Sequence, residues 1–401
     1  MAIVNTNTRY GSVTRIFHWL TALLVMTLIP VAMIAHELPY ETSEQLAQKA
    51  WLYSLHKTLG VTVFFVALLR ILWALSQPKP ASLHPERRVE NLLAETAHWL
   101  LYGSLVLAPL SGWIHHAATS GFAPIWWPLG QSLPLVPTSE TVAALFGGLH
   151  WVFGKVMILA LLLHIVGALK HHFIDKDATL RRMLNGAPEL VDLPIAHHGR
   201  SPLVAAIAIW AVVLTGAGVF GFYTPKEGAV EAATLSKVAS DWIVKDGSIQ
   251  IGVTQFGSVV EGRFTDWTAN ITFDPAIQGG KSGQVEVIIA IGSLTLGSVT
   301  DQAMGPDFFD VSRFDTATFN ADIITNIDGF TADGTLTIKD VSIPVSMPFR
   351  LSLDGDDANV QAQLTLNRMD FGIGANMPDE GSLAFAVGVT INLDATKSTP
   401  E

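Results

Sequence analysis

The sequence predicts a bundle of membrane-spanning helices followed by an all-β domain. Apolar runs of membrane length fill the first half of the 401-residue chain, whereas short alternating patterns rich in Thr, Asp, Gly and Val follow Tyr223. The halves also differ in charge, because residues 1–200 carry a net charge of +3 and residues 201–401 a net charge of −14. We therefore expect three parts. A membrane domain covers residues 1–190, a loop with the last span and a linker covers residues 191–239, and a β domain covers residues 240–401.

Five apolar runs are long enough to cross a bilayer, which requires about 20 helical residues. No small-residue cleavage site follows the first run, so we expect no cleavable signal peptide. The predicted spans cover residues 16–35, 51–75, 95–115, 149–173 and 202–223.

Loop charge predicts the orientation of these spans. Basic residues gather in the loops that contain Arg15, Arg88 and Arg182, while the loops around Glu41 and Glu140 are acidic. Basic loops stay in the cytoplasm, so we expect a cytoplasmic amino end in a bacterial inner membrane. An odd number of spans then puts the β domain in the periplasm.

Two histidines lie in register on the fourth predicted span. His150 and His164 are separated by close to four helical turns, so they share a face and lie about 21 Å apart along the axis. Ionisable side chains inside a membrane span are costly and mark functional sites. The alternative is that each histidine packs against a neighbouring helix and bonds a backbone carbonyl.

Depth in the membrane selects a partner for each of these histidines. His18 enters from the cytoplasmic side, at the depth of His164, and His56 enters from the outer side, at the depth of His150. Each pair can supply both axial nitrogens of a b-type haem, with the two irons about 20 Å apart. The chain has no cysteine, which excludes the covalent attachment of c-type haem. Arg70 is a candidate for a haem propionate, with ordinary positive-inside anchoring as the alternative.

Two glycines, Gly60 and Gly154, each follow a candidate ligand by four residues. A missing side chain one turn from a ligand leaves room for a flat macrocycle, although small residues also permit close helix contact. Lys57 is expected to snorkel to the membrane surface. Nine further histidines are weaker candidates for cofactor binding. They lie in loops, at the cytoplasmic boundary, or at the ends of the third span without a partner at equal depth. They are His36, His84, His98, His115, His116, His171, His172, His197 and His198.

An ordered set of motifs over residues 8–185 resembles the bacterial cytochrome b561 family. The motifs are Arg15-x-x-His18-Trp19, His56-x-x-x-Gly60 with Arg70, His98-x-x-x-Tyr102 with Pro109 and Gly112, and His150-x-x-x-Gly154 with His164 and His171-His172-Phe173. The resemblance implies a four-helix bundle that holds two b haems and exchanges electrons with quinone. It carries the ligand role onto His18, His56, His150 and His164. Some members are described as superoxide oxidases that pass the electron to ubiquinone, and the fifth span is an addition to the family pattern.

Period-two alternation of apolar residues predicts antiparallel strands after Ser240. Every second residue is apolar over residues 285–291 and 385–393. Asp328-Gly329 and Asp333-Gly334 look like hairpin turns. Several strands over about 160 residues suit a closed barrel, whose interior either holds a ligand or is filled by side chains.

Segments over residues 240–396 resemble the YceI family, among them the stretches WIVKDGSIQIGVTQF and GTLTIKDVSIPVSMPF. That family has a lipocalin-like barrel and binds isoprenoid chains such as those of quinones, which implies a quinone or related isoprenoid as ligand here. Many members keep a histidine in the opening strand and before the IPV-like segment. Here those places read Gly247-Ser248-Ile249 and Lys339-Asp340-Val341, so polar head-group contacts and any metal role stay unassigned.

These features together predict a membrane-bound oxidoreductase. It connects the quinone pool with a periplasmic-side donor or acceptor, for which superoxide is one candidate although the acidic β domain is poorly suited to attract an anion. One alternative is a membrane-anchored isoprenoid carrier in which haem is secondary, and another is a haem-b subunit of a larger dehydrogenase. Four histidines in register favour electron transfer, since a mere anchor has no use for them. Neither catalytic residues nor the direction of electron flow follow from the sequence, and no nucleic acid partner is expected.

Overall fold

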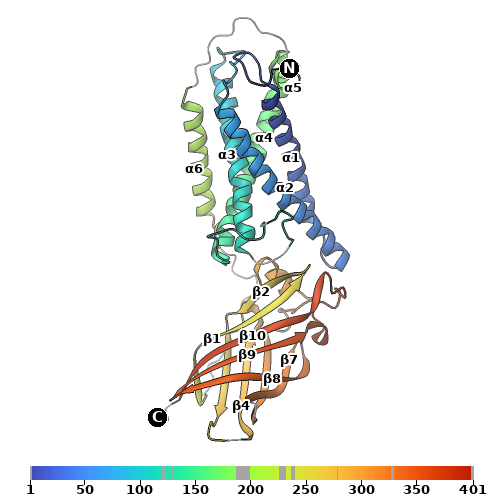
Figure 1. The fold of residues 1–401 in the computed structure, drawn as a ribbon, viewed down its shortest axis with the longest axis vertical. Helices are drawn as coiled ribbons and strands as arrows, with labels where there is room; N and C mark the ends of the chain where they lie inside the picture. Colours follow the sequence, from blue (N-terminus) through green and yellow to red (C-terminus); the bar gives the residue numbers. More distant parts are fainter. Residues whose placement is uncertain are drawn as a thin grey trace. The chain divides into compact units, whose positions relative to one another are not determined.

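The computed structural model describes residues 2–119, 123–128, 130–186, 199–224, 232–235, 240–277, 279–326 and 329–398. The chain divides into a helical unit and a β unit, drawn in Figure 1. The helical unit holds Met1–Glu37, Trp51–Ala118 and Pro124–Pro225, and the β unit holds Leu38–Ala50, Thr119–Ala123 and Lys226–Glu401.

Long helices lie side by side in the helical unit (Figure 1). They are α1 (Ser12–Glu37), α2 (Ser43–Leu75), α3 (Arg88–Ala118), α4 (Glu140–Lys170) and α6 (Ser201–Val219), with a π-helical turn, η1 (His171–Asp175), and the short α5 (Thr179–Leu184) after α4. Among the described residues, α1, α2, α4 extended through η1, and α6 are long and apolar enough to cross a membrane. The more polar α3, which packs against α4 and α6, is not one of these four helices, so its membrane crossing stays a prediction.

Apolar residues of the bundle fall into an inner and an outer set. Val25 of α1, Val63 of α2 and Leu105 of α3 belong to one buried cluster. Other large apolar side chains face outward, for example Leu72 at 64% exposure and Val212 at 72%. An apolar outer surface is stable next to lipid but not next to water, which agrees with the predicted membrane environment.

The β unit is one ten-stranded antiparallel sheet that curls on itself (Figure 1). The strand order is β3-β4-β6-β7-β8-β9-β10-β1-β2-β5. The strands are β1 (Trp242–Gln255), β2 (Ser258–Phe264), β3 (Trp267–Phe273), β4 (Gly280–Ala290), β5 (Leu294–Thr295), β6 (Thr316–Asn326), β7 (Gly329–Ile338), β8 (Val341–Asp354), β9 (Asp357–Asn367) and β10 (Leu383–Lys397). A short helix, α7 (Thr300–Met304), lies between β5 and β6 in the chain.

The start of β1 lies against β3, the strand at one end of the sheet order. Asp241 N donates to Ile271 O over 3.1 Å, and Trp242 Nε1 donates to Phe273 O over 3.0 Å, so this segment lies against β3. Further along, β1 pairs with β10, with Trp242 opposite Lys397, and then with β2. The predicted antiparallel architecture is confirmed, as a curled half-barrel whose hydrogen-bonded strand order ends at β3 and β5.

One of the two predicted hairpin turns in the β unit is wrong. Asp333-Gly334 is not a turn but lies inside β7, where a Cβ on Gly334 would collide with the carbonyl oxygen of Asn320 on β6. Glycine is therefore required there for close strand approach. Asp328 lies outside the described residues. Lys339 and Asp340 make the β7–β8 turn with φ of 52° and 60°, as a type I′ hairpin requires.

Candidate functional site

His56 and His150 meet between α2 and α4, with ring centroids 6.2 Å apart. His56 Nδ1 lies 3.1 Å from the Leu28 carbonyl oxygen, and His150 Nδ1 lies 2.7 Å from that of Ala108. A carbonyl oxygen can only accept a hydrogen bond, so each Nδ1 carries the proton and each Nε2 is left free to bind a metal. The sequence offered a hydrogen bond to a backbone carbonyl as the alternative to metal binding. Here each imidazole can do both, because Nδ1 makes the hydrogen bond and Nε2 stays available for a metal.

His18 and His164 form a second pair, between α1 and α4, with ring centroids 6.0 Å apart. Metal–imidazole bonds are about 2 Å long, so a metal between two opposed imidazoles separates their ring centroids by about 6 Å. Both pairs have this spacing, so the residues present fit a six-coordinate haem iron with two axial histidines. The structure therefore brings together the four histidines that the sequence selects, in the two predicted pairs.

A cavity of about 410 Å³ opens beside His18 and His164. Arg70 and Tyr102 also line it, and the Arg70 guanidinium lies 5.4 Å from the centre of the Tyr102 ring. None of the ion pairs found among the described residues involves Arg70. A cation on the wall of this cavity suits the carboxylate of a bound group.

Space next to the histidines is kept open by glycines. A Cβ on Gly60 or Gly154 would find no atom within 4 Å, so a planar group has room beside each of them. Gly112 of α3 has a different role, since a Cβ there would lie 2.8 Å from His150 Nδ1. Gly112 therefore makes room for the imidazole itself.

The β unit encloses a second cavity, of about 290 Å³. Its wall is built from inward-facing apolar side chains of the strands, such as Ile251, Val287 and Phe319. Three lining residues carry an amide or a charge, namely Gln255, Gln302 and Arg368. The cavity therefore suits a long apolar molecule.

Comparison with known proteins divides the chain at the same place as the structure. Residues 9–186 match the family model of prokaryotic cytochrome b561, and residues 242–396 match that of the YceI-like domain. Cytochrome b561 homolog 2 of Escherichia coli is 32% identical over 192 residues, which cover 46% of this chain and 95% of the relative.

The chain belongs to the prokaryotic cytochrome b561 family.

Two further relatives match one unit each. The "Probable superoxide oxidase CybB" of Yersinia pestis is 26% identical over 168 residues, which cover 42% of this chain and 90% of the relative. A UPF0312 protein of Yersinia pestis is 30% identical over 160 residues, which cover 36% of this chain and 82% of the relative. The protein is thus a cytochrome b561 with a YceI-like domain, and its family membership implies haem b binding and membrane electron transfer.

Histidines of α3 make contacts that the sequence does not predict. His98 lines the 410 Å³ cavity, and its ring centroid lies 5.0 Å from that of His164. His115 Nδ1 lies 2.7 Å from the Ala143 carbonyl oxygen. Lys57 does not simply snorkel, because its Nζ lies 3.4 Å from His116 Nδ1. These contacts depend on how α3 is rotated about its own axis, and the sequence indicates that rotation only weakly.

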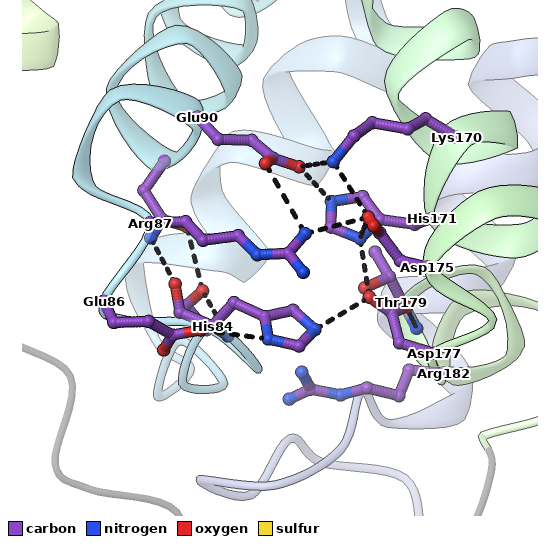
Figure 2. Close-up of polar contacts among 12 residues, drawn as sticks. His84, Glu86, Arg87, Glu90, Lys170, His171, Asp175, Asp177, Thr179 and Arg182 are labelled. Carbon is purple, nitrogen blue, oxygen red and sulfur yellow. Dashed lines mark hydrogen bonds and ion pairs between the residues drawn. The ribbon is translucent and has the colours of Figure 1, made fainter.

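His171 belongs to a polar cluster between the start of α3 and the end of α4 (Figure 2). Lys170 Nζ bridges the carboxylates of Glu90, at 2.6 Å, and Asp175, at 2.9 Å. Arg87 lies 3.0 Å from Asp175. Glu90, His171 and Asp175 are close enough to hold a metal ion, but Lys170 and Arg87 already neutralise both carboxylates, which favours a structural role.

Asp177 links this cluster to the loop before α3. Its carboxylate lies 2.6 Å from His171 Nδ1 and 3.2 Å from His84 Nε2, and it accepts a hydrogen bond from Thr179 N over 2.8 Å. Burial raises the pKa of Asp177, but the hydrogen bonds from Thr179 and His171 lower it by more, so the pKa lies below its ordinary value. The cluster thus joins the chain before α3 to the chain after α4.

Proposed function

We propose that this cytochrome b561 binds two b haems and transfers electrons between the quinone pool and a donor or acceptor at the periplasmic face. The observation that carries the proposal is the presence of two histidine pairs with centroid separations of 6.0 and 6.2 Å. Their members on α4, His164 and His150, are about 21 Å apart by helical rise. Two redox centres at this spacing form a path across most of the bilayer.

Each part of the chain has a defined task in this proposal. His18 with His164, and His56 with His150, hold the two groups, and Arg70 binds a propionate of the group next to His18. Haem b, when bound, supplies reversible one-electron transfer. The carbonyls of Leu28 and Ala108 fix the orientation of their imidazoles and raise the basicity of the ligating nitrogens. The apolar residues around the pairs exclude water.

Localisation follows from the loop charges, which favour an inner-membrane protein with a cytoplasmic amino end and a periplasmic β unit. The apolar cavity of that unit supports a quinone or related isoprenoid as its ligand. Because one chain carries both units, the ligand stays at a high effective concentration for the redox reaction.

Superoxide is a second candidate for the periplasmic donor. It is favoured by the similarity to the probable superoxide oxidase of Yersinia pestis and by Lys57, whose ammonium group reaches His116 on the helix next to His150. The net charge of −14 over residues 201–401 acts against attraction of this anion.

An optical redox titration of the purified full-length protein tests the proposal. Two one-electron steps with b-type spectra are expected, followed by rapid reduction of both centres when a short-chain quinol is mixed with the oxidised protein. Superoxide generated in the same stopped-flow cell distinguishes the second donor. A single redox step, or centres that neither quinol nor superoxide reduces, would contradict the proposed function.

A further inference from the structure

We propose that Gln255 and Gln302 form a head-group site in the cavity of the β unit, and that this site selects a neutral isoprenoid with a carbonyl or hydroxyl oxygen. The inference rests on the proposed isoprenoid-binding function and specifies which part of the ligand the protein recognises. It addresses a point that the sequence leaves open, because the histidines found in many YceI-like domains are absent here.

Two glutamines that line the cavity each carry a buried amide atom without a hydrogen-bond partner. Gln255 is the last residue of β1 and only 5% exposed, and Gln302 belongs to α7. Within the described part of the chain, neither Gln255 Oε1 nor Gln302 Nε2 has a partner. Buried polar atoms are nearly always paired in native proteins, so a bound molecule is the expected source of the missing hydrogen bonds.

Neighbours of the two amides pack in the same apolar cluster. Val253 lies two residues before Gln255 and therefore on the same face of β1. Val253 and Ala303, the neighbour of Gln302, pack in one apolar cluster. The rest of the wall is almost entirely apolar, so a ligand with one polar end is oriented with that end toward Gln255 and Gln302.

The chemistry of the amides fits a neutral oxygen. Each glutamine carries both a donor and an acceptor. An N–H of Gln302 can donate to a quinone carbonyl, and Gln255 Oε1 can accept from a quinol hydroxyl. Gln302 can therefore pair with the oxidised head group, whereas both amides pair with the reduced one, whose hydroxyl groups donate as well as accept.

An anionic head group lacks a matching cation in this cavity. Arg368 is the charged residue on the wall, but its guanidinium is fully used. Its N–H groups donate to the carbonyl oxygens of Ala384, Ile373, Gly374, Met377 and Leu383, at distances of 2.6 to 3.0 Å. An arginine side chain has five N–H donors in total, so none remains for a phosphate.

Photolabelling of the full-length protein tests this assignment. Three probes carry the same photoreactive group at the end of the same prenyl chain: a prenylated benzoquinone, a prenyl diphosphate and a prenyl hydrocarbon without a head group. Labelled peptides from residues 240–398 are quantified by mass spectrometry, which separates the β unit from any quinone site in the helical unit. The quinone probe should label the β unit at the lowest concentration.

Each variant replaces an amide by an apolar chain of similar length. Gln302→Met should raise the half-labelling concentration of the quinone probe, and Gln255→Met that of the same probe in its reduced, quinol form, about 10-fold or more. Labelling by the hydrocarbon probe should not change. Gln250→Met is the matched control, because Gln250 is exposed on the outer face of β1.

The outcomes separate this inference from the function on which it rests. Equal labelling by quinone and hydrocarbon in the wild type would overturn the head-group site. Quinone labelling unchanged in Gln302→Met, together with quinol labelling unchanged in Gln255→Met, would do the same. Labelling by the diphosphate as strong as that by the quinone would overturn the selection of a neutral ligand. Absence of labelling by all three probes would instead remove isoprenoid binding itself.

Discussion

The imidazoles of His56 and His150 lie 6.2 Å apart, and each is held through Nδ1 by a backbone carbonyl of another helix. These carbonyls belong to Leu28 of α1 and Ala108 of α3, so all four long helices that precede α5 contribute to one histidine pair. Two opposed imidazoles that are oriented before a metal binds cost little entropy on coordination. A variant that displaces an imidazole can therefore be compared with a variant that removes it.

Replacement of either histidine of this pair should halve the haem content. His150→Ala or His56→Ala removes one axial nitrogen, whereas His18 and His164 keep theirs, so we expect two haems per chain in the wild type and one in each variant. A pyridine haemochrome assay on purified protein measures the ratio. His115→Ala serves as the control and should retain two haems. Loss of both haems, or of neither, would contradict the pairing.

Gly112→Ala should disturb the same haem while every ligand stays in place. The new Cβ would lie 2.8 Å from His150 Nδ1, so the imidazole must move away from the Ala108 carbonyl. Loss of that hydrogen bond costs about 0.5–1.5 kcal/mol and should shift the potential of one haem or release it. Redox titration checks this. Gly167→Ala, at a position with no atom within 4 Å of the added Cβ, should leave both potentials unchanged.

Arg368→Met should destabilise the β unit by about 3 kcal/mol or more, because it leaves several buried carbonyl groups without donors. Arg350→Met is a suitable control, since Arg350 is exposed on β8. Urea denaturation followed by circular dichroism in the β-sheet region measures the difference. A midpoint for Arg368→Met equal to that of Arg350→Met would show that the carbonyls are satisfied without the guanidinium.

Asp177→Asn should lower the free energy of unfolding of the helical unit by about 1–3 kcal/mol at pH 7. The pKa of Asp177 is lower in the folded protein than in the unfolded chain, where it is about 3.9. The stabilisation is therefore complete above that pH and is lost as the pH falls through the folded pKa. The difference in melting temperature between wild type and variant, followed by haem absorbance, should shrink below about pH 4. A difference that stays constant down to pH 3 would exclude the carboxylate charge as its cause.

Alkaline phosphatase fused after Lys397 should be active, because the loop charges predict a periplasmic β unit. A cytoplasmic reporter such as β-galactosidase at the same position should be inactive. The opposite pattern would reject the predicted number of spans.

The sequence predicts the histidine pairs well because helical rise fixes depth from residue spacing alone. It fails for Lys57, His98 and His171, whose contacts depend on how each helix is rotated toward its neighbours. Spacing along one helix does not contain that information.

In the β unit, alternation predicts strands such as β4 and β10, because the side-chain period of a strand is local. Gly334 is required because β6 approaches β7 closely at this position. The Asp-Gly dipeptide does not contain that information. Gln255 and Gln302 resemble ordinary surface amides in the sequence, and only the curled sheet shows that they border a cavity.

The pairing of β1 with β10 has a consequence for biosynthesis. Trp242, the first residue of the sheet, lies opposite Lys397, the last. One edge of β1 therefore waits for its partner until the ribosome has made the whole unit, and contacts so distant in sequence form slowly. The consecutive hairpins from β6 to β9 can pair as they emerge, but the edge of β1 that pairs with β10 stays exposed until the final strand arrives.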